Sequence, residues 1–306
     1  MNNRDYKDPR FCLQFTVSDS GILLREFLQQ KGISKRTLTA TKYGGGTLKV
    51  NGVEQNVRYT LMQGDEVEII FPQEEISNGL IAEDGDLNIV YEDDAIIIID
   101  KPPGKSTIPS RDHPSGTIAN AIAGKFLREN IPATVHVVTR LDRDTSGLIC
   151  IAKNRHIHHL LSKQMEDNGF TRQYEAVVEG QVEKDAFVIE APIGRKDGSI
   201  IERIVREDGQ YARTDVRVIE RIGNGKCNLT RVRLVLHTGR THQIRVHMYW
   251  TGHSLAGDDL YGGTRTLIDR QALHCATLKF QHPLNGECME FRSDIPTDMK
   301  LLCRIS

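Results

Sequence analysis

The stretch from Thr139 to Leu148 reads TRLDRDTSGL and combines four charged side chains with three hydroxyls. The segments on either side, residues 135–138 and 148–152, are apolar and rich in branched residues, which is typical of short buried strands. A polar turn between two such strands ends at a sheet edge, where loops carry functional groups. By spacing alone, ion pairs of Asp142 and Asp144 with the two arginines of this stretch are the more common explanation.

A resemblance favours a functional interpretation instead. The pattern Arg-Leu-Asp-x-x-Thr-Ser-Gly at residues 140–147 resembles the signature of the RluA-type pseudouridine synthases, which isomerise uridine in RNA. Three further segments resemble other blocks of that family and occur in the family's order: 100–104 (DKPPG), 173–176 (QYEA) and 239–247 (GRTHQIRVH). One position departs from the pattern, because Thr139 stands where the family usually has a histidine.

The resemblance implies an α+β fold. We expect residues 87–306 to form a catalytic domain with a mixed, mainly antiparallel sheet and flanking helices. The run 95–99 (AIIII) reads as a buried central strand. From Tyr174 onward a second strand alternates, so Tyr174 should point inward with Ala176 and Val178. Thr241 suits the N-cap of a later helix that carries Arg245.

The implied reaction breaks the N1–C1′ bond of uridine, turns the base over and rejoins it through C5. The resemblance assigns Asp142 as the essential carboxylate, which either attacks carbon directly or promotes elimination to a glycal. Arg245 would pair with Asp142, and Tyr174 would stack on the base and accept the C5 proton. The reaction has no redox change, so we expect no cofactor, and the sequence lacks a P-loop and a dinucleotide fingerprint.

Four further residues are predicted to bind the substrate. Arg140 could fill the space that a flipped uridine leaves, or hold a neighbouring phosphate. Lys101 ends the strand before the prolines, where it is either solvated or in contact with RNA or the cleft. The remaining candidates lie in the later block: Arg240 and His242.

Residues 1–75 read as a separate small α+β module. Residues 22–28 have apolar side chains at helical spacing, Ser34 can cap a second helix, and Asn51-Gly52 predicts a hairpin turn. This order loosely resembles the alpha-L RNA-binding motif that often precedes the catalytic domain in the family. The polar, acidic residues 76–86 then form a linker. The candidate phosphate contacts are Arg25, Lys35 and Arg36.

Composition sets further limits. The 306 residues carry a net charge of −1, which counts mildly against RNA unless a basic cleft is balanced by acidic surfaces. No apolar run of about 18 residues predicts a membrane span, and Met1–Tyr6 lacks a signal-peptide core. We therefore expect a cytoplasmic monomer. In that compartment, free thiols are expected at Cys12, Cys150, Cys227, Cys275, Cys288 and Cys303.

Three other interpretations remain open at this point. A glycosidase could use Asp142 and Asp144, although acids two residues apart rarely face each other across a sugar. A non-catalytic RNA-binding protein could share the fold. Transfer RNA could replace large-subunit ribosomal RNA as the substrate, since that choice rests on family habit. We expect no metal, because the close histidines His156, His158 and His159 lack the spacing of a zinc site.

Overall fold

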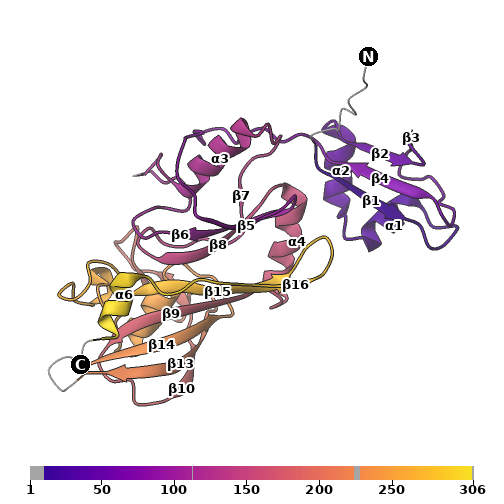
Figure 1. The fold of residues 1–306 in the computed structure, drawn as a ribbon. Helices are drawn as coiled ribbons and strands as arrows, with labels where there is room; N and C mark the ends of the chain where they lie inside the picture. The colour runs from indigo at the N-terminus through magenta and orange to yellow at the C-terminus, as the bar shows by residue number, and fades with distance from the viewer. Residues whose placement is uncertain (1–9, 112, 224–227, 305–306) are drawn as a thin grey trace.

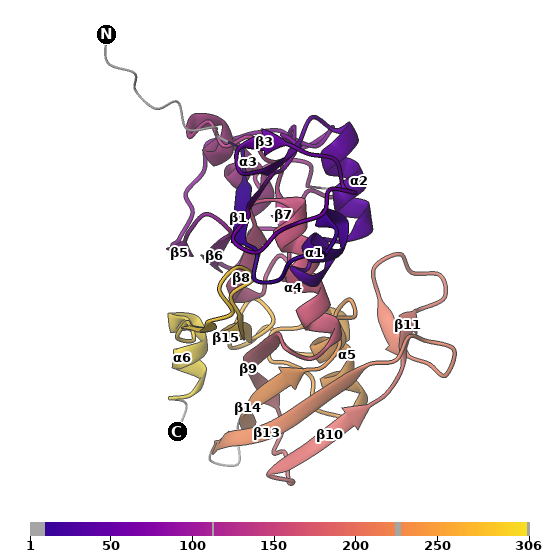
Figure 2. The same ribbon diagram turned by 90° about the vertical axis from the view of Figure 1, so that its right-hand side faces the viewer.

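The computed structural model describes residues 10–111, 113–223 and 228–304, and Figure 1 shows the arrangement of its elements. Met1–Tyr6 and Cys227, which figured in the expectations above, lie outside these ranges. A small hydrophobic core lies within residues 11–71, and a larger one unites residues beyond 86. The small unit lies next to helix α4 (Arg155–Glu166), as the turned view also shows (Figure 2).

The small unit contains two helices and a four-stranded antiparallel sheet in the order β1-β4-β2-β3. The side chain of Ser34 accepts a hydrogen bond from the amide of Thr37, which confirms the predicted cap. Asn51 and Gly52 both have positive φ, as the predicted hairpin turn requires. The elements are β1 (Cys12–Thr16), α1 (Leu24–Gln30), α2 (Lys35–Tyr43), β2 (Thr47–Val50), β3 (Val53–Glu54) and β4 (Glu66–Ile70).

The polar, acidic segment after β4, residues 72–86, forms neither helix nor strand, but it is held against the larger part of the chain. It packs against α3 (Ile118–Arg128), where the side-chain amide of Asn120 donates to the carbonyl of Ile81 at 2.7 Å. A Cβ at Gly124 would lie 2.0 Å from the carbonyl oxygen of Glu83. Only a glycine therefore allows this close approach between the segment and the helix.

The remaining chain is built on a ten-stranded sheet in the order β10-β13-β14-β9-β15-β8-β6-β5, with β7 and β16 added beside β8 and β15. All pairings are antiparallel except that of β15 with β8. Its strands are β5 (Ile89–Glu92), β6 (Ile96–Lys101), β7 (His136–Val137), β8 (Ser146–Ala152), β9 (Thr171–Glu179), β10 (Ala186–Glu190), β13 (Arg213–Ile222), β14 (Leu229–Leu236), β15 (Leu273–Gln281) and β16 (Cys288–Arg292).

Helices flank this sheet, and a separate two-stranded hairpin projects from it near α5 (Figure 2). The mixed, mainly antiparallel sheet with flanking helices confirms the predicted α+β class. The remaining elements are α4 (Arg155–Glu166), the hairpin of β11 (Ile193–Arg195) and β12 (Arg203–Val205), α5 (Gln243–Trp250), a 3-10 turn (Asp259–Tyr261) and α6 (Thr297–Leu302).

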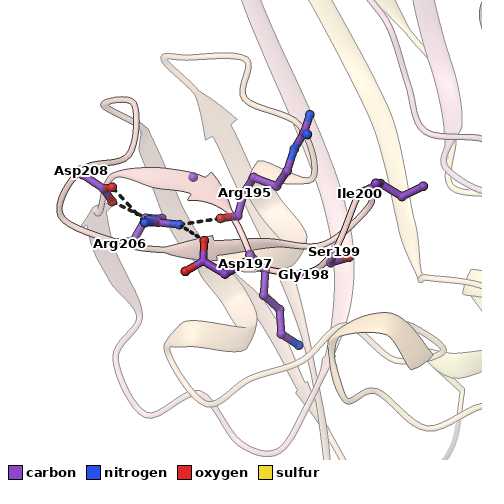
Figure 3. A pocket seen from close by; sticks show the side chains of 9 residues that line it. Arg195, Asp197, Gly198, Ser199, Ile200, Arg206 and Asp208 are labelled. Carbon is purple, nitrogen blue, oxygen red and sulfur yellow. Dashed lines mark hydrogen bonds and ion pairs between the residues drawn. The ribbon is translucent and has the colours of Figure 1, made fainter.

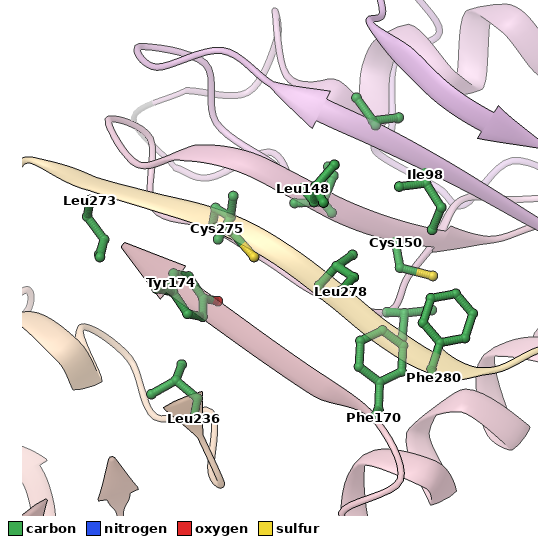
Figure 4. Packing of buried hydrophobic residues seen from close by; sticks show 14 of the residues in the cluster. Ile98, Leu148, Cys150, Phe170, Tyr174, Leu236, Leu273, Cys275, Leu278 and Phe280 are labelled. Atoms are coloured by element: carbon green, nitrogen blue, oxygen red, sulfur yellow. The ribbon is translucent and has the colours of Figure 1, made fainter. Parts of the chain in front are cut away.

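The core of the sheet is as apolar as the sequence predicts. The four isoleucines at 96–99 are fully buried, and so is nearly all of β8. Figure 4 shows the side chains between β9, β15 and β8, where the rings of Phe170 and Phe280 stack with centroids 4.7 Å apart. Further along the same strands, Tyr174 lies beside Cys275, so the core continues directly into the residues described next.

Candidate active site

The Thr139–Leu148 stretch forms the turn between β7 and β8. The hydroxyl of Thr139 accepts a hydrogen bond from the amide of Cys150 at 2.9 Å, and the amide of Thr145 donates to the carbonyl of Asp142 at 3.1 Å. A Cβ on Gly147 would lie 2.3 Å from the carbonyl oxygen of Cys275, because β15 runs in parallel beside it. The turn is therefore fixed at both ends by the sheet.

The carboxylate of Asp142 meets the side chain of Arg245, which comes from α5. The Nη1 atom of Arg245 lies 3.1 Å from Oδ2 of Asp142. Arg245 is only 7% exposed and also forms two hydrogen bonds with the buried Asp258, from Nε to Oδ2 at 2.7 Å and from Nη2 to Oδ1 at 2.8 Å. Burial alone would lower the pKa of Arg245, but these carboxylates outweigh it and raise the pKa above its ordinary value.

Helix α5 begins one residue later than predicted. Its N-cap is His242, which has a left-handed backbone with φ of 56° and no capping side chain, so the prediction of Thr241 as the cap is wrong. The side chain of Gln243 instead braces the loop before the helix, since its Oε1 accepts from the amide of Arg240 at 3.0 Å. Threonine is a preferred N-cap residue, which is why the sequence favoured Thr241 over His242.

His242 lies beside the central carboxylate. Its Nε2 is 3.8 Å from Oδ2 of Asp142, and its Nδ1 is 2.9 Å from the hydroxyl of Tyr261. Burial lowers the pKa of His242, although the charge of Asp142 opposes this effect. The imidazole is thus placed to contact a bound substrate in its neutral form.

Tyr174 points inward from β9, as the alternation predicts, and is 5% exposed. Its side chain lies beside the thiol of Cys275 (Figure 4). Burial raises the pKa of Tyr174 well above its ordinary value, and the nearby thiol adds to this shift. The phenol is therefore protonated at neutral pH, a state that suits contact with a base better than proton uptake as a phenolate.

These residues line a cavity of about 810 Å³, a size that suits a nucleotide-sized ligand. The exposed Arg140 stands at its edge, and Arg240 lines it while its Nε donates to the carbonyl of Tyr211 at 2.9 Å. Sequence reasoning missed Arg172, whose guanidinium also lines the cavity and donates to the carbonyl of Thr238 at 3.1 Å. Arg172 lies two residues before Tyr174 on the same strand, so both side chains face the same side of the sheet, and this spacing could have indicated its place.

Lys101 does not contact this cavity, which corrects its prediction as a substrate-binding residue. Its side chain is fully buried at the end of β6. The Nζ atom donates to three backbone carbonyls, those of Pro102 at 2.9 Å, Lys105 at 2.7 Å and Arg143 at 2.9 Å. Strand β6 directs the side chain of Lys101 into the protein and away from the cavity. The ammonium group therefore supports the turn that carries Asp142 from its buried side.

The three cations predicted to bind RNA lie on the small unit, away from the cavity. Arg25 is exposed on α1, where it forms an ion pair with Glu26 at 3.5 Å. Lys35 and Arg36 are exposed in the first turn of α2. The structure places them on one unit but assigns them no ligand.

A second hollow of about 610 Å³ lies in the β11–β12 hairpin (Figure 3). Its arginine, Arg206, is already engaged by Asp208, by Asp197 at 2.9 Å and by the carbonyl of Arg195 at 2.8 Å. None of the residues predicted to carry the reaction lines it. This hollow therefore belongs to the internal structure of the hairpin.

Among the described residues, no group of three or more histidine, cysteine or acidic side chains could hold a metal ion. His156 instead packs against Phe71 of the small unit with ring centroids 5.2 Å apart, and burial lowers its pKa to about 4.

In the same described ranges, no helix has the length and apolar character needed to cross a bilayer.

Comparison with known proteins identifies the family. A family model described as RNA pseudouridylate synthase matches residues 95–250. A protein of Bacillus subtilis (strain 168) named "Uncharacterized RNA pseudouridine synthase YjbO" is 48% identical over 281 residues, which are 92% of this chain and 98% of that protein. A Vibrio cholerae protein named "Ribosomal large subunit pseudouridine synthase D" is 37% identical over 268 residues, covering 83% of this chain and 81% of its own.

The solved structure of "Human RNA Pseudouridylate Synthase Domain Containing 1" has the same fold, with a TM-score of 0.56 and 24% identity over 72% of this chain and 86% of the human one. These matches exclude the glycosidase interpretation, in which Asp142 and Asp144 act together. Asp144 instead pairs with Arg143 at 3.1 Å within the turn. The chain therefore belongs to the RluA-type branch of the RNA pseudouridylate synthase family and is an isomerase that acts on RNA.

Proposed function

We propose that this enzyme converts specific uridines of large-subunit ribosomal RNA to pseudouridine, with Asp142 as the essential carboxylate and without a cofactor. The name of the Vibrio cholerae relative supports the choice of ribosomal RNA. The observation that carries the chemical part is the position of Asp142, at a nucleotide-sized cavity and in contact with the cation of Arg245.

The surroundings of Asp142 fit this role. Its side chain is 32% exposed, so it can reach a bound sugar, whereas Arg245 is buried behind it. A guanidinium that donates a hydrogen bond to a carboxylate favours the ionised form of the carboxylate. In the proposal, ionised Asp142 acts at C1′ or promotes elimination while the N1–C1′ bond breaks, and the C5 proton passes to water after C5 has bonded to the sugar.

The other cavity residues hold the flipped nucleotide. Tyr174 packs against the base, and Arg140 enters the space in the RNA that the base has left. Arg240 and His242 contact the phosphate and the sugar near Asp142. The positions of these residues support this division, because Tyr174 is buried in the cavity wall and Arg140 is exposed at its edge.

The small unit gives the enzyme a second contact with RNA. We propose residues 1–75 as an alpha-L-type RNA-binding module, 76–86 as its connection and 87–306 as the catalytic domain. Exposed cations on two neighbouring helices support this, since they suit phosphate groups along an RNA backbone: Arg25, Lys35 and Arg36. A cytoplasmic monomer completes the proposal.

The test uses cells that lack this protein, complemented with wild type, Asp142→Asn or Asp144→Asn. Carbodiimide-probed primer extension then maps pseudouridine in ribosomal and transfer RNA. We expect specific stops in large-subunit ribosomal RNA to vanish in the knockout and to return with wild type and Asp144→Asn only. Asp144 is the matched control because its side chain pairs with Arg143 at the surface. Stops lost from transfer RNA alone would overturn the proposed substrate, and restoration by Asp142→Asn would overturn the proposed carboxylate.

A further inference from the structure

Part of the active site lies beyond the segment that the family model matches. The turn at residues 255–263 follows α5 and brings Asp258 and Tyr261 against Arg245. The backbone fixes this turn closely, since the carbonyl of Asp258 accepts from the amides of Tyr261 at 3.1 Å and Gly263 at 2.8 Å. A Cβ on Gly257 would lie 2.0 Å from the carbonyl oxygen of Arg270, so the turn cannot shift without disturbing its neighbours.

The side chains of this turn hold the guanidinium of Arg245 on two sides. Asp258, which is fully buried, takes the Nε and Nη2 donors at 2.7 and 2.8 Å. The ring of Tyr261 covers one face, with its centroid 5.0 Å from Cζ. Tyr261 is held in turn by its hydroxyl, which accepts from the amide of Arg203 at 3.0 Å. Only Nη1 of Arg245 is then directed at Asp142.

This arrangement leaves one oxygen of Asp142 available. In the described residues, its carboxylate contacts Arg245 at 3.1 Å and His242 at 3.8 Å, and both contacts go to Oδ2. In the described part of the chain, no hydrogen bond is made to Oδ1. An arginine without other partners pairs with a carboxylate through two parallel hydrogen bonds, which would engage both oxygens. Asp258 holds Nε and Nη2 of Arg245 and so fixes the orientation of the guanidinium, and in this orientation only Nη1 reaches the carboxylate of Asp142.

We propose that Asp258 is a positioning residue, which with Tyr261 aims one donor of Arg245 at Oδ2 of Asp142 and keeps Oδ1 free for the substrate. This inference rests on the proposed role of Asp142. Asp258 acts through Arg245 and touches no substrate, so its loss should slow the chemical step and leave RNA binding unchanged. Because Asp258 would act through Arg245, the rate losses caused by substituting Asp258 and Arg245 should not add when the two substitutions are combined.

The experiment compares Asp258→Asn with Asp259→Asn in the full-length enzyme on ribosomal RNA transcripts. Asp259 is the matched control, because it is the next residue and pairs with Arg265 at the surface at 2.9 Å. We expect kcat to fall at least tenfold in Asp258→Asn, with KM within twofold of wild type, while Asp259→Asn stays within twofold in both constants. Wild-type kcat in a folded Asp258→Asn protein would overturn the inference.

Single-turnover rates in the Arg245→Lys background distinguish positioning from general structural damage. If Asp258 acts through Arg245, adding Asp258→Asn to Arg245→Lys should cost much less than the tenfold seen alone; losses that multiply in full would contradict this. Should Asp258→Asn not fold, Tyr261→Leu is compared with Tyr261→Phe, because both lose the hydroxyl contacts with His242 and Arg203 and only leucine loses the ring face over Arg245. An active Asp142→Asn enzyme would instead refute the proposed function, whatever the result at Asp258.

Discussion

The ammonium group of Lys101 donates a 2.9 Å hydrogen bond to the carbonyl of Arg143, the residue directly after Asp142. Two further hydrogen bonds tie the same group to the carbonyls of Pro102 and Lys105. One buried cation thus joins the loop after β6 to the turn that carries the central carboxylate. The three N–H donors of an ammonium match these three acceptors, so another side chain cannot replace it without leaving buried carbonyls unpaired.

Lys101→Met should therefore destabilise the protein. Each buried carbonyl left without a donor costs about 1–3 kcal/mol, and partial relaxation limits the total to about 2–4 kcal/mol at pH 9, where the neutral amine of Lys101 still supplies two N–H donors. Urea unfolding of wild type and variant measures this difference. Lys105→Met is the control, because the Lys105 side chain makes only a long contact of 3.5 Å with the carbonyl of Asp86. Equal losses in both variants would contradict the structural role of Lys101.

The effect of Lys101→Met should also depend on pH. Burial lowers the pKa of Lys101 to about 7, although the charges of Asp144 and Asp142 oppose this, whereas lysine in an unfolded chain has a pKa of about 10.4. The unfolded chain then binds more protons between these values, so the lysine contributes more stability as pH rises through this range. The loss on Lys101→Met should be larger at pH 9 than at pH 6.5, and a pH-independent loss would contradict the lowered pKa.

Gly147→Ala should destabilise the parallel pairing of β8 with β15. Its φ of 108° is strained for alanine, and its Cβ would meet the backbone of Cys275 at 2.3 Å. We expect a loss of about 3 kcal/mol or more in unfolding free energy. Gly286→Ala is the control, since it also has positive φ (72°) but opens onto free space. It should lose about 1 kcal/mol, and equal losses would show that the close approach of β15 is unimportant.

Tyr174→Phe should retain the fold, because it keeps the buried ring and removes only the hydroxyl, at a cost of about 1 kcal/mol. The raised pKa keeps the phenol protonated below pH 10, so titration of Tyr174 cannot shape the rate at lower pH. The dependence of kcat on pH between 6 and 9 should therefore run parallel in variant and wild type. A rising limb that is present in wild type and lost in Tyr174→Phe would show a catalytic phenolate and refute this account.

Removing the three exposed cations of the small unit should weaken RNA binding without changing the chemical step. Each phosphate contact adds to the slope of log Kd against log salt, so the triple glutamine variant should show a shallower slope and an unchanged single-turnover rate at saturating enzyme. The substituted residues are Arg25, Lys35 and Arg36. The control replaces exposed cations that do not line the cavity: Lys184, Arg217 and Lys279. Equal slopes in both triple variants would contradict the module's role.

Local features of this fold were predictable from the sequence because they depend on neighbouring residues. Ser34 and Asn154 cap their helices as their side chains dictate, and the Asn51-Gly52 turn follows from the positive φ that both residues tolerate. The burial of residues 96–99 follows from their unbroken apolar run. The pairing of Arg245 with Asp142 was expected only through the family resemblance, since 103 positions separate the two residues.

Features that depend on distant contacts were not predictable. Residues 255–263 belong to none of the four segments that resemble the family, yet Asp258 forms the closest ion pair of Arg245 there. Lys101 reads equally well as a solvated side chain, because nothing in its neighbours reveals the carbonyl of Arg143 above it. Thr241 has a better capping side chain than His242, but the helix begins after His242, whose backbone is left-handed and whose side chain contacts Tyr261.

The central claim is that Asp142 is the essential carboxylate of uridine isomerisation, and tritium release tests it most directly. Ribosomal RNA transcripts carrying uridine tritiated at C5 lose tritium to water only when C5 exchanges its hydrogen for the bond to the sugar. We predict release with wild-type enzyme and with Asp144→Asn, and release at least a thousandfold slower with Asp142→Asn that is folded and still binds the RNA. Release by Asp142→Asn at a rate near that of wild type would contradict the account.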